Sequence, residues 1–557
     1  MENLVELLEQ ATSKYPGSVA LEGDVEGLGL FSLTRTDILG RAAGLAERLL
    51  EAGVKPGDPV ALLSPNRPEW AVGYFAVQLA GGVLVPLDIN LKPGELTNIL
   101  RRSGAAALMT DATLHEAALS LWEEGAAPLP LLRVDEPLAA EALPISRWPG
   151  AKRRKDDLAL ISFSSGTTGM PKGVMLTQGN ITSNAQASLA LCDCGPEDVF
   201  LSILPLHHMF ESTAGLLAPF ISGAKVHYLS SLNPRVLGAA MHREGITICL
   251  MVPALARLMH RRIMSTALST GGLWGVLFRL LFGISKGALF FGYRLGRFLF
   301  PQVKRRLSPR LRYFISGGAA LDPAIGRDLL ALGIEVVQGY GLTETSPVTH
   351  ANRPGKGNRI GTVGPPLPGV EMRLEPVEGA AKGEGKILIR GPNVMKGYFG
   401  DPELTAEVLQ DGWFHTGDIG RVDADGYLTI CGRSKNVIVA ESGKNIYPEE
   451  VEEELAKSDL FKAACVIGKK IPQGGEEVFA VVALNPDAEL PPDEAARKEA
   501  ARAEINRVCG NLADYKRVSD FVIWSGEEFP RTTTLKYKKE EIKAALRQMS
   551  GFGPGDF

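Results

Sequence analysis

Residues 163–177, FSSGTTGMPKGVMLT, form the stretch that decides the fold of this chain. Small and hydroxyl-bearing residues precede one lysine, Lys172, and follow the apolar run Leu158–Ile161, which predicts a buried strand. Such a loop can direct backbone N–H groups, hydroxyls and a lysine charge at one anion. Pro171 and Gly173 flank the lysine, so the loop differs from the P-loop, in which Gly-Lys-Ser/Thr opens a helix. The stretch therefore predicts a phosphate-binding loop of another kind.

Length and composition indicate a globular protein of more than one domain. The chain has 557 residues, too many for one hydrophobic core, with 45% hydrophobic and 22% charged residues. Its six cysteines lack the spacing of a metal site, so we expect free thiols in a reducing cytosol. The acidic N-terminal segment lacks the basic and apolar parts of a secretory signal. We expect a cytoplasmic protein with no nucleic-acid partner, and the oligomeric state stays open.

The order of apolar and helical segments predicts an α/β fold. Short apolar runs alternate with helical patterns such as Asp37–Ala52, as in parallel sheets joined by crossover helices. These runs lie at 59–64, 81–87, 105–110, 158–163, 247–253, 311–315 and 334–337. Because ligand loops follow the carboxyl ends of parallel strands, we expect the phosphate loop, 316–318 and 339–340 to converge on one nucleotide.

The remaining pattern predicts a large N-terminal domain of two layered parallel-type sheets and a small, mobile C-terminal α+β domain. Short strands between Gly, Pro and Asp turns indicate a β subdomain at about 365–432. We place the N-terminal domain at 1–432, with an apolar and basic insertion at 263–310, and the C-terminal domain at 436–557. The family resemblance described next implies that the first is an adenylation domain, that 433–435 is a hinge and that the second is a lid domain.

Four further segments resemble motifs of the adenylate-forming superfamily, and they follow one another in the order in which these motifs occur in that superfamily. This superfamily comprises acyl-CoA synthetases, luciferases and the adenylation domains of peptide synthetases. The segments are QGYGLTET at 338–345, DGWFHTGD at 411–418, GRSKN at 432–436 with GKNIYPEE at 443–450, and PRTTTLK at 530–536. The stretch 163–177 resembles the signature loop of the same superfamily. The resemblance covers nearly the whole chain, and its last motif resembles the long-chain fatty acid–CoA ligase branch.

The resemblance implies ATP, Mg²⁺ and coenzyme A, with a small carboxylic acid as substrate. Lys536 would bridge the carboxylate and the α-phosphate, and the other implied catalytic residues are Glu344, Thr343 and His208. Glu344 and the hydroxyl of Ser164 would hold the metal. The reaction requires this charge because a carboxylate and a triphosphate, both anionic, must meet.

The resemblance also implies binding residues for each substrate. Lys435 and Gly443 would form the hinge and the coenzyme A tunnel, and His208, Met209 and Phe210 would line the mouth of the acyl pocket. The implied ATP-binding residues are Ser164, Ser165, Gly166, Thr167, Thr168, Lys172, Gly317, Gly318, Ala319, Gln338, Gly339, Tyr340, Thr343, Asp418, Arg433 and Lys435.

Some of these assignments have structural rivals. Leu535 stands where many members of the superfamily have glycine, which leaves Lys538 and Lys539 as alternatives to Lys536. A histidine at 208 could simply be packed in the core, with His207 as the functional one. Asp418 could cap the segment that follows it instead of binding ATP, and Glu344 could be an exposed loop carboxylate instead of a metal ligand. Arg433 could be a simple surface arginine, and Lys444 could be solvated instead of contacting the nucleotide.

The composition favours a hydrophobic substrate. Residues 245–321 are rich in Ile, Leu, Phe, Met and Trp, so we expect a medium- or long-chain fatty acid, with aryl and alicyclic acids left open. Because no carrier domain is attached, coenzyme A is the expected acceptor. The alternatives are a ligase that passes the acyl group to a carrier protein and a non-catalytic acyl or nucleotide binder. The longest uncharged run there, Ile263–Phe278, has 16 residues, fewer than the roughly 20 that span a bilayer.

Charge is distributed unevenly along the chain. Residues 245–321 contain twelve Lys or Arg and no Asp or Glu, whereas the whole chain has a net charge of −4, so the remainder carries −16. In one continuous helix, Arg279, Lys286, Arg294 and Arg297 would fall within an arc of about 80°. Such a stripe suits a helix in the interface of an anionic membrane, at the inner face of the cell membrane. The alternative is an amphipathic hairpin that covers the acyl pocket.

Overall fold

The computed structural model of the chain describes most of its residues. The described residues are 3–25, 29–123, 127–136, 144–164, 171–229, 233–269, 273–472, 474–526, 528–531, 537–549, 552–553 and 555–557. They divide into two compact units, the first made of Met1–Glu371 and Arg390–Gly412 and the second of Met372–Ile389 and Trp413–Phe557.

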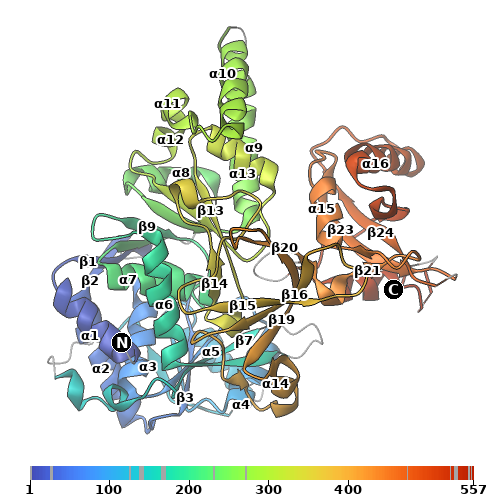
Figure 1. Cartoon of the computed structure of the whole chain (residues 1–557). Helices are drawn as coiled ribbons and strands as arrows, with labels where there is room; N and C mark the ends of the chain where they lie inside the picture. Colours follow the sequence, from blue (N-terminus) through green and yellow to red (C-terminus); the bar gives the residue numbers. More distant parts are fainter. Residues whose placement is uncertain are drawn as a thin grey trace. The chain divides into compact units, whose positions relative to one another are not determined.

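The first unit contains two large, mainly parallel sheets with helices around them, which confirms the predicted α/β class (Figure 1). In strand order, the eight-stranded sheet is β14 (Val348–Ala351), β13 (Val336–Gly341), β12 (Tyr313–Ser316), β11 (Ile248–Met251), β9 (Val199–Ser202), β10 (Lys225–Tyr228), β1 (Val19–Val25) and β2 (Gly29–Thr34). The seven-stranded sheet is β17 (Gly397–Tyr398), β8 (Lys172–Thr177), β7 (Leu158–Ser164), β4 (Val83–Pro86), β3 (Pro59–Leu63), β5 (Ala107–Thr110) and β6 (Leu131–Arg133).

Helices cover these sheets because their apolar residues are packed against them. Helix α3 (Pro68–Ala80) is buried along its whole length, as expected of a helix that is apolar on all sides. Helix α2 (Arg35–Glu51) begins at Thr34, whose hydroxyl accepts a hydrogen bond from Asp37 N in a capping box. The other helices over the sheets are α1 (Leu4–Lys14), α4 (Pro93–Ser103), α5 (His115–Glu123), α6 (Gln178–Cys192), α8 (Pro234–Arg243) and α13 (Pro323–Ala331).

The second unit combines the predicted β subdomain with the C-terminal α+β region. Its elements are β15 (Glu371–Pro376), β16 (Glu384–Arg390), β19 (Trp413–Val422), β20 (Leu428–Arg433), β21 (Ile438–Val439), β22 (Asn445–Ile446), α15 (Pro448–Leu455), β23 (Phe461–Lys470), β24 (Glu476–Leu484), α16 (Glu494–Val508), β25 (Asp520–Ile523) and α17 (Lys539–Leu546). The packing therefore groups the β subdomain with the C-terminal region. The hinge at 433–435 concerns motion and stays a prediction.

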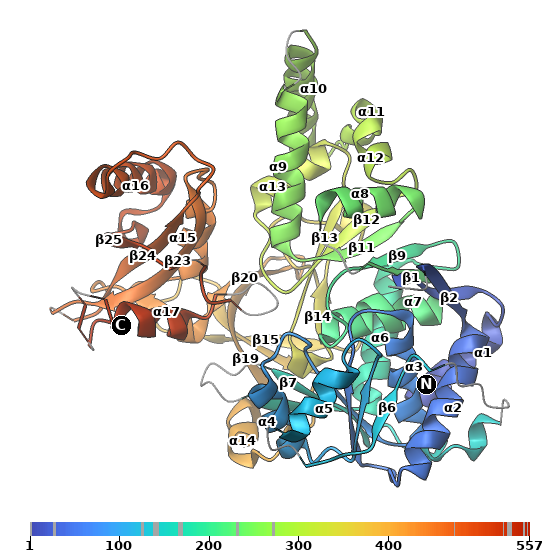
Figure 2. The same ribbon diagram turned by 180° about the vertical axis from the view of Figure 1, so that it is seen from behind.

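Between β11 and β12 the chain leaves the eight-stranded sheet as a helical hairpin. Helix α9 (Pro253–Ser269) and helix α10 (Leu273–Phe290) run side by side away from the sheet in both views (Figures 1 and 2). The short helices α11 (Gly296–Leu299) and α12 (Pro301–Leu307) lead back to β12. Of the helices that the structure describes, α10 alone is long and apolar enough to cross a membrane by length and composition.

The expected four-residue basic stripe is wrong. Helix α10 ends at Phe290, and Gly292 has a positive φ of 80°, so the chain turns before Arg294 and Arg297. Two of the four charges also pair with acidic residues of the first unit. Lys286 Nζ lies 2.7 Å from Asp328 Oδ1, and Arg294 Nη1 lies 2.7 Å from Glu335 Oε1.

Candidate active site

The phosphate loop connects two antiparallel strands at one edge of the seven-stranded sheet. Strands β7 and β8 pair so that Ser164 lies opposite Lys172, and the loop departs from this pair. Ser165, Gly166, Thr167 and Thr168 lie outside the described residues, as does the side chain of Ser164. The hairpin thus fixes both ends of the predicted loop and places Lys172 where it ends.

Tyr398 connects the phosphate loop to the predicted metal ligand. Its hydroxyl donates a hydrogen bond of 2.9 Å to Glu344 Oε1, and Lys172 Nζ lies 5.5 Å from the centre of its ring. Tyr398 lies on β17, which pairs with β8, so residues more than 50 positions apart meet at one point. The sequence analysis missed Tyr398 because no periodicity or spacing marks it. Lys172 and Glu344, both predicted, are thereby brought together.

The turn that carries Glu344 is held by buried amides. Thr343–Thr345 forms a short 3₁₀ helix, and the Glu344 carbonyl accepts a hydrogen bond of 2.8 Å from Met395 N. The amide of Asn393 donates to the Thr345 carbonyl at 2.9 Å, and that of Asn184 donates to the Val348 carbonyl at 2.6 Å. A half-buried carboxylate on a turn fixed in this way is preorganised rather than a mobile loop residue.

The carboxyl ends of four neighbouring strands lie at the same edge of the eight-stranded sheet, where further predicted residues follow β12. Strands β9, β11, β12 and β13 run parallel in adjacent positions, so the segments after them emerge together. Gly317, Gly318 and Ala319 follow β12, and Gly318 has a φ of 83°, which favours glycine. Gly339 and Tyr340 lie within β13 itself. Their convergence with the phosphate loop on one nucleotide stays a prediction, because residues 165–170 lie outside the described part of the chain.

Gln338 and Tyr340 lie on β13. Gln338 is buried, and its Oε1 accepts a hydrogen bond of 3.1 Å from Leu321 N, so it fixes the loop that follows β12. The half-buried ring of Tyr340 lies 6.1 Å from the ring of His350. Burial lowers the pKa of His350 to about 3, so this imidazole is neutral behind Tyr340.

The residues predicted for the acyl pocket lie next to the Gly317 loop. A Cβ at Gly317 would lie 2.9 Å from Phe210 Cζ, so the Phe210 ring occupies the space beside this glycine. Phe210 opens a π-helix, Phe210–Leu217, a form that is frequent at functional sites. Met209 is buried in front of it, and His208 is half-buried.

His207 is packed differently from its neighbour. Its Nε2 lies 3.6 Å from Asp88 Oδ2, and its ring centre is 4.1 Å from that of His208. Burial lowers the pKa of His207, against the opposing effect of Asp88. We therefore assign His207 a packing role and retain His208 as the candidate at the pocket mouth.

In the second unit, Asp418 and Arg433, both predicted to bind ATP, form a pair. Asp418 on β19 and Arg433 on β20 are register partners, and Arg433 Nε lies 2.9 Å from Asp418 Oδ1. Asp418 is buried within its strand rather than at a helix cap. Lys435 lies in the 3₁₀ turn Ser434–Asn436, and Gly443 has a φ of 73° in the turn between β21 and β22.

Lys536 lies outside the described residues, whereas its two rivals, Lys538 and Lys539, are described. Lys539 is only partly exposed, and its Nζ lies 2.9 Å from Glu452 Oε1 and 3.0 Å from the Val466 carbonyl. The nearby Glu452 carboxylate raises the pKa of Lys539, although burial acts in the opposite direction. Lys538 pairs with Glu541 at 2.9 Å on α17. Both lysines have acidic partners within the C-terminal region, and the assignment of Lys536 stays a prediction.

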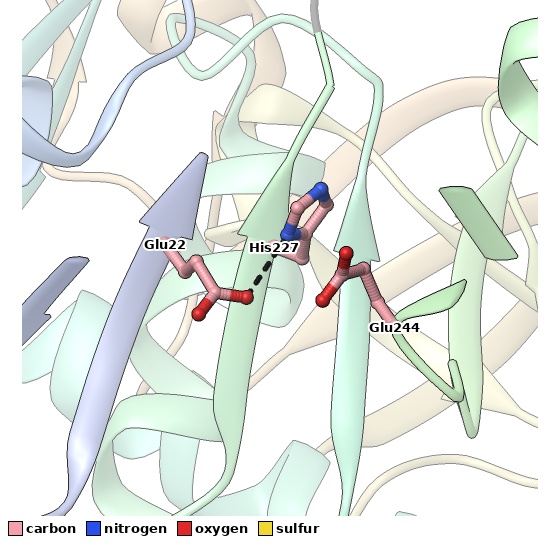
Figure 3. A group of neighbouring side chains, drawn as sticks. All are labelled: Glu22, His227 and Glu244. Atoms are coloured by element: carbon pink, nitrogen blue, oxygen red, sulfur yellow. Dashed lines mark hydrogen bonds and ion pairs between the residues drawn. The ribbon is translucent and has the colours of Figure 1, made fainter. Parts of the chain in front are cut away.

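Another titratable cluster lies on the eight-stranded sheet, away from these loops. Figure 3 shows Glu22, His227 and Glu244 side by side, with ligand atoms within 4.8 Å of one another. Glu22 Oε1 lies 2.8 Å from Lys225 Nζ and 3.2 Å from His227 Nδ1, and Glu244 Oε1 lies 2.5 Å from Arg243 Nε. Because each carboxylate already has a cationic partner, we interpret the cluster as an ion-pair network.

This network predicts an acid-dependent loss of stability. The hydrogen bond with His227 lowers the pKa of Glu22 to about 2, assisted by Lys225 and opposed by burial. A depressed pKa means that the contribution is complete above the unfolded value near 4.5 and disappears as the pH falls towards 2. We expect Glu22→Gln to lower the free energy of unfolding by up to about 3 kcal/mol at pH 7. Denaturant unfolding from pH 7 to 3 should show this difference shrinking; a constant difference would contradict the assignment.

A second prediction concerns Tyr398. We expect Tyr398→Phe to raise the KM for Mg·ATP and to lower kcat/KM by roughly ten-fold, because Glu344 loses a hydrogen bond to its charged oxygen. Steady-state kinetics with varied Mg·ATP measures this effect. Tyr293→Phe, which changes an exposed tyrosine of the same unit, is the matched control. An unchanged KM for Mg·ATP would show that Tyr398 does not position Glu344.

The place of Lys172, the Tyr398–Glu344 hydrogen bond and the Gly317 segment after β12 are the described features that agree with an adenylate-forming enzyme. The chain belongs to the AMP-binding enzyme family, which matches residues 8–399, and the AMP-binding enzyme C-terminal domain matches residues 450–536. Enzymes of this family form acyl-adenylates and use ATP, Mg²⁺ and coenzyme A. At this level the chain is an AMP-forming acid–CoA ligase of the acyl or aryl type.

Comparisons with named proteins agree on this class. The chain is 35% identical to a feruloyl-CoA synthase of Amycolatopsis sp over 81% of its length and 83% of that protein. It is 30% identical to the peroxisomal long chain acyl-CoA synthetase 7 of Arabidopsis thaliana, over 96% of its own length and 81% of that protein. Among solved structures, ATP-bound MatB from Rhodopseudomonas palustris is similar with a TM-score of 0.75 and 26% identity, over 98% and 99% of the two chains. The o-succinylbenzoate CoA synthetase of Bacillus subtilis in complex with its acyl-adenylate intermediate is similar with a TM-score of 0.76 and 25% identity, over 98% of each chain.

Proposed function

We propose that this chain activates a hydrophobic carboxylic acid with ATP and transfers the acyl group to coenzyme A, with medium- or long-chain fatty acids as the first candidates. The observation that carries the proposal is the cluster of Lys172, Tyr398 and Glu344 at the phosphate loop. Phe210, which lies beside Gly317 after β12, would offer an apolar surface to the acyl group.

In the first half-reaction, a carboxylate oxygen attacks the α-phosphorus of ATP. The new bond gives an acyl-adenylate, and the bond to the β-phosphate oxygen breaks, so pyrophosphate leaves. Lys172 would neutralise phosphate charge, and Lys536 would bridge the carboxylate and the α-phosphate. Glu344 fits Mg²⁺, which takes one or two carboxylates together with substrate phosphates. When bound there, Mg²⁺ would supply further neutralisation of the triphosphate.

In the second half-reaction, the thiol sulfur attacks the acyl carbonyl carbon. The thioester forms, the carbon–oxygen bond to AMP breaks, and the thiol proton passes to solvent. We propose that the C-terminal region rotates at 433–435 between the two steps, withdrawing Lys536 and bringing in the loop at Gly443. Asp418 and Arg433 would hold the ribose hydroxyls through this exchange.

The class of acid has two supported candidates. The long chain acyl-CoA synthetase relative and the apolar region 245–321 support a fatty acid. The 35% identity to feruloyl-CoA synthase supports an aryl-substituted acid. A carrier protein in place of coenzyme A remains the alternative acceptor. The alternative that is not an enzyme is a protein that binds an acyl group or a nucleotide without catalysis.

One assay separates these possibilities. Pyrophosphate release is measured with fatty acids of graded chain length, with ferulate and with an alicyclic acid, each with and without coenzyme A. The proposal expects the largest kcat/KM for a fatty acid and a thioester product only with coenzyme A. A larger kcat/KM for ferulate would transfer the assignment to aryl acids. Pyrophosphate release without formation of a coenzyme A thioester would indicate a carrier protein as the acceptor. If no acid led to pyrophosphate release, the chain would be assigned as a non-catalytic binding protein.

A further inference from the structure

We propose that the outer half of helix α10 inserts into the interface of a bilayer that contains anionic lipids. The surface that carries this inference is an apolar stripe on α10, made of Leu273, Val276, Leu277, Leu280 and Ile284. Their side chains are 39% to 83% exposed. At 100° per residue they fall within an arc of about 100°, so they form one continuous face.

This stripe faces away from the protein. The opposite face of α10 carries the contacts with the body of the first unit. The Phe278 ring lies 5.7 Å from that of Phe282 and 5.5 Å from that of Phe300. The hydroxyl of the buried Ser285 donates to the Ala331 carbonyl at 2.7 Å. The apolar stripe is therefore a second apolar face, beyond the one that packing requires, and water-facing patches of this kind mark interaction sites.

The geometry fits insertion into the interface rather than a full span. Ser285 and Lys286 hold the inner part of α10 against α13, through Ala331 and Asp328. The outer part, residues 273–284, has twelve residues and is about 18 Å long. The hydrocarbon core of a bilayer is about 30 Å thick, whereas interfacial segments enter about 5–10 Å. The held half of the helix thus limits how deeply the tip can enter.

Charge favours an anionic surface over a protein partner of mixed charge. Residues 245–321 contain no Asp or Glu. The exposed Arg279 flanks the stripe on α10. Arg261 and Arg262 are exposed on α9 next to His260, which contacts Asp328 at the level of Lys286. Basic residues beside an apolar face are the pattern of an interfacial helix, in which each charge near the head groups adds attraction.

The hairpin also connects this surface to the candidate active site. Helix α9 begins directly after β11, and the segment after α12 returns to β12, at whose end Gly317 lies against Phe210. A lipid-soluble acid would then be collected where it is most concentrated. The lipid contact itself depends only on this surface and does not rest on the proposed reaction.

Vesicle binding tests the proposal with the full chain. Co-sedimentation is measured with vesicles of phosphatidylcholine alone and of phosphatidylcholine with phosphatidylglycerol. We expect binding that requires the anionic lipid and weakens with salt. Replacing the stripe residues Leu273, Val276 and Leu280 by serine should weaken it roughly ten-fold or more. The matched control replaces Leu30 and Val236, exposed apolar residues on other elements, by serine. Binding kept by the stripe variant, or equal loss in the control, would overturn the proposal.

Trp274 gives an independent readout, because it lies at the tip and is 72% exposed. Insertion should shift its fluorescence to the blue and allow quenching by brominated lipids, and Trp274→Phe should remove both signals. Absence of quenching in wild type would overturn insertion. Size-exclusion chromatography without lipid tests whether the stripe mediates self-association. If the wild type were a dimer and the stripe variant a monomer, the stripe would be a dimer interface and the membrane proposal would be overturned. Pyrophosphate release with a water-soluble acid, measured without vesicles, tests the proposed function separately. A failure of that function can thus be distinguished from a failure of membrane binding.

Discussion

Replacing Lys536 by alanine is expected to lower the rate of acyl-adenylate formation by roughly 10²-fold or more, while thioester formation from added acyl-adenylate stays within a few-fold of wild type. The reason is that the lysine charge is proposed to meet the carboxylate and the α-phosphate only in the first half-reaction, where it is preorganised for the transition state. Two measurements check this: pyrophosphate release for the first step, and thioester formation from synthetic acyl-adenylate for the second.

The neighbouring lysines supply the controls. Lys538→Ala should leave both half-reactions nearly unchanged, because Lys538 pairs with Glu541 on α17. Lys539→Met should instead destabilise the C-terminal region by about 1–3 kcal/mol, because it leaves the partly exposed Glu452 without its cation. Equal damage to both half-reactions by Lys536→Ala would refute its assignment, and a selective loss of adenylation in Lys538→Ala would give that role to Lys538.

The strand positions of the first unit could be predicted because parallel strands covered by helices are continuous apolar runs. The predicted run at 158–163 is β7 (Leu158–Ser164), and that at 334–337 lies in β13. Strands β9 and β10 were not among the predicted runs, although they are parallel and mostly buried in the same sheet. Strands β1 and β2 were also missed: they pair antiparallel at the end of this sheet, and their residues mix polar and apolar types without a long uniform run.

The site was predictable only where a motif carried it. Lys172 and Glu344 each stand in a recognisable stretch, whereas Tyr398 acts through contacts with residues far away in the sequence. The partial burial of Lys539 is equally invisible in the sequence, because a lysine between two charged residues is typical of a solvated helix start. Its partner Glu452 comes from α15, and only folding brings the two together.

Helix α10 shows how one residue decides a surface. Helical periodicity predicted one basic stripe through Arg294 and Arg297, but the positive φ of Gly292 ends the helix near Phe290. What remains outside is an apolar stripe with basic flanks rather than a basic stripe with apolar flanks. The composition of 245–321 thus indicated the type of surface, and the backbone turn determined its arrangement.

Replacing Lys435 by proline is expected to leave acyl-adenylate formation within a few-fold of wild type and to slow thioester formation by roughly 10²-fold. Proline fixes φ near −65° and removes the backbone N–H, so a rotation at the 3₁₀ turn Ser434–Asn436 becomes restricted. The same two half-reaction assays measure the effect. Lys435→Ala is the matched control, since it removes the side chain but keeps the backbone rotation, and it should preserve thioester formation much better than proline does. If alanine and proline were equally damaging, the side chain and not the hinge would matter, and wild-type overall turnover in the proline variant would place the hinge elsewhere in the chain.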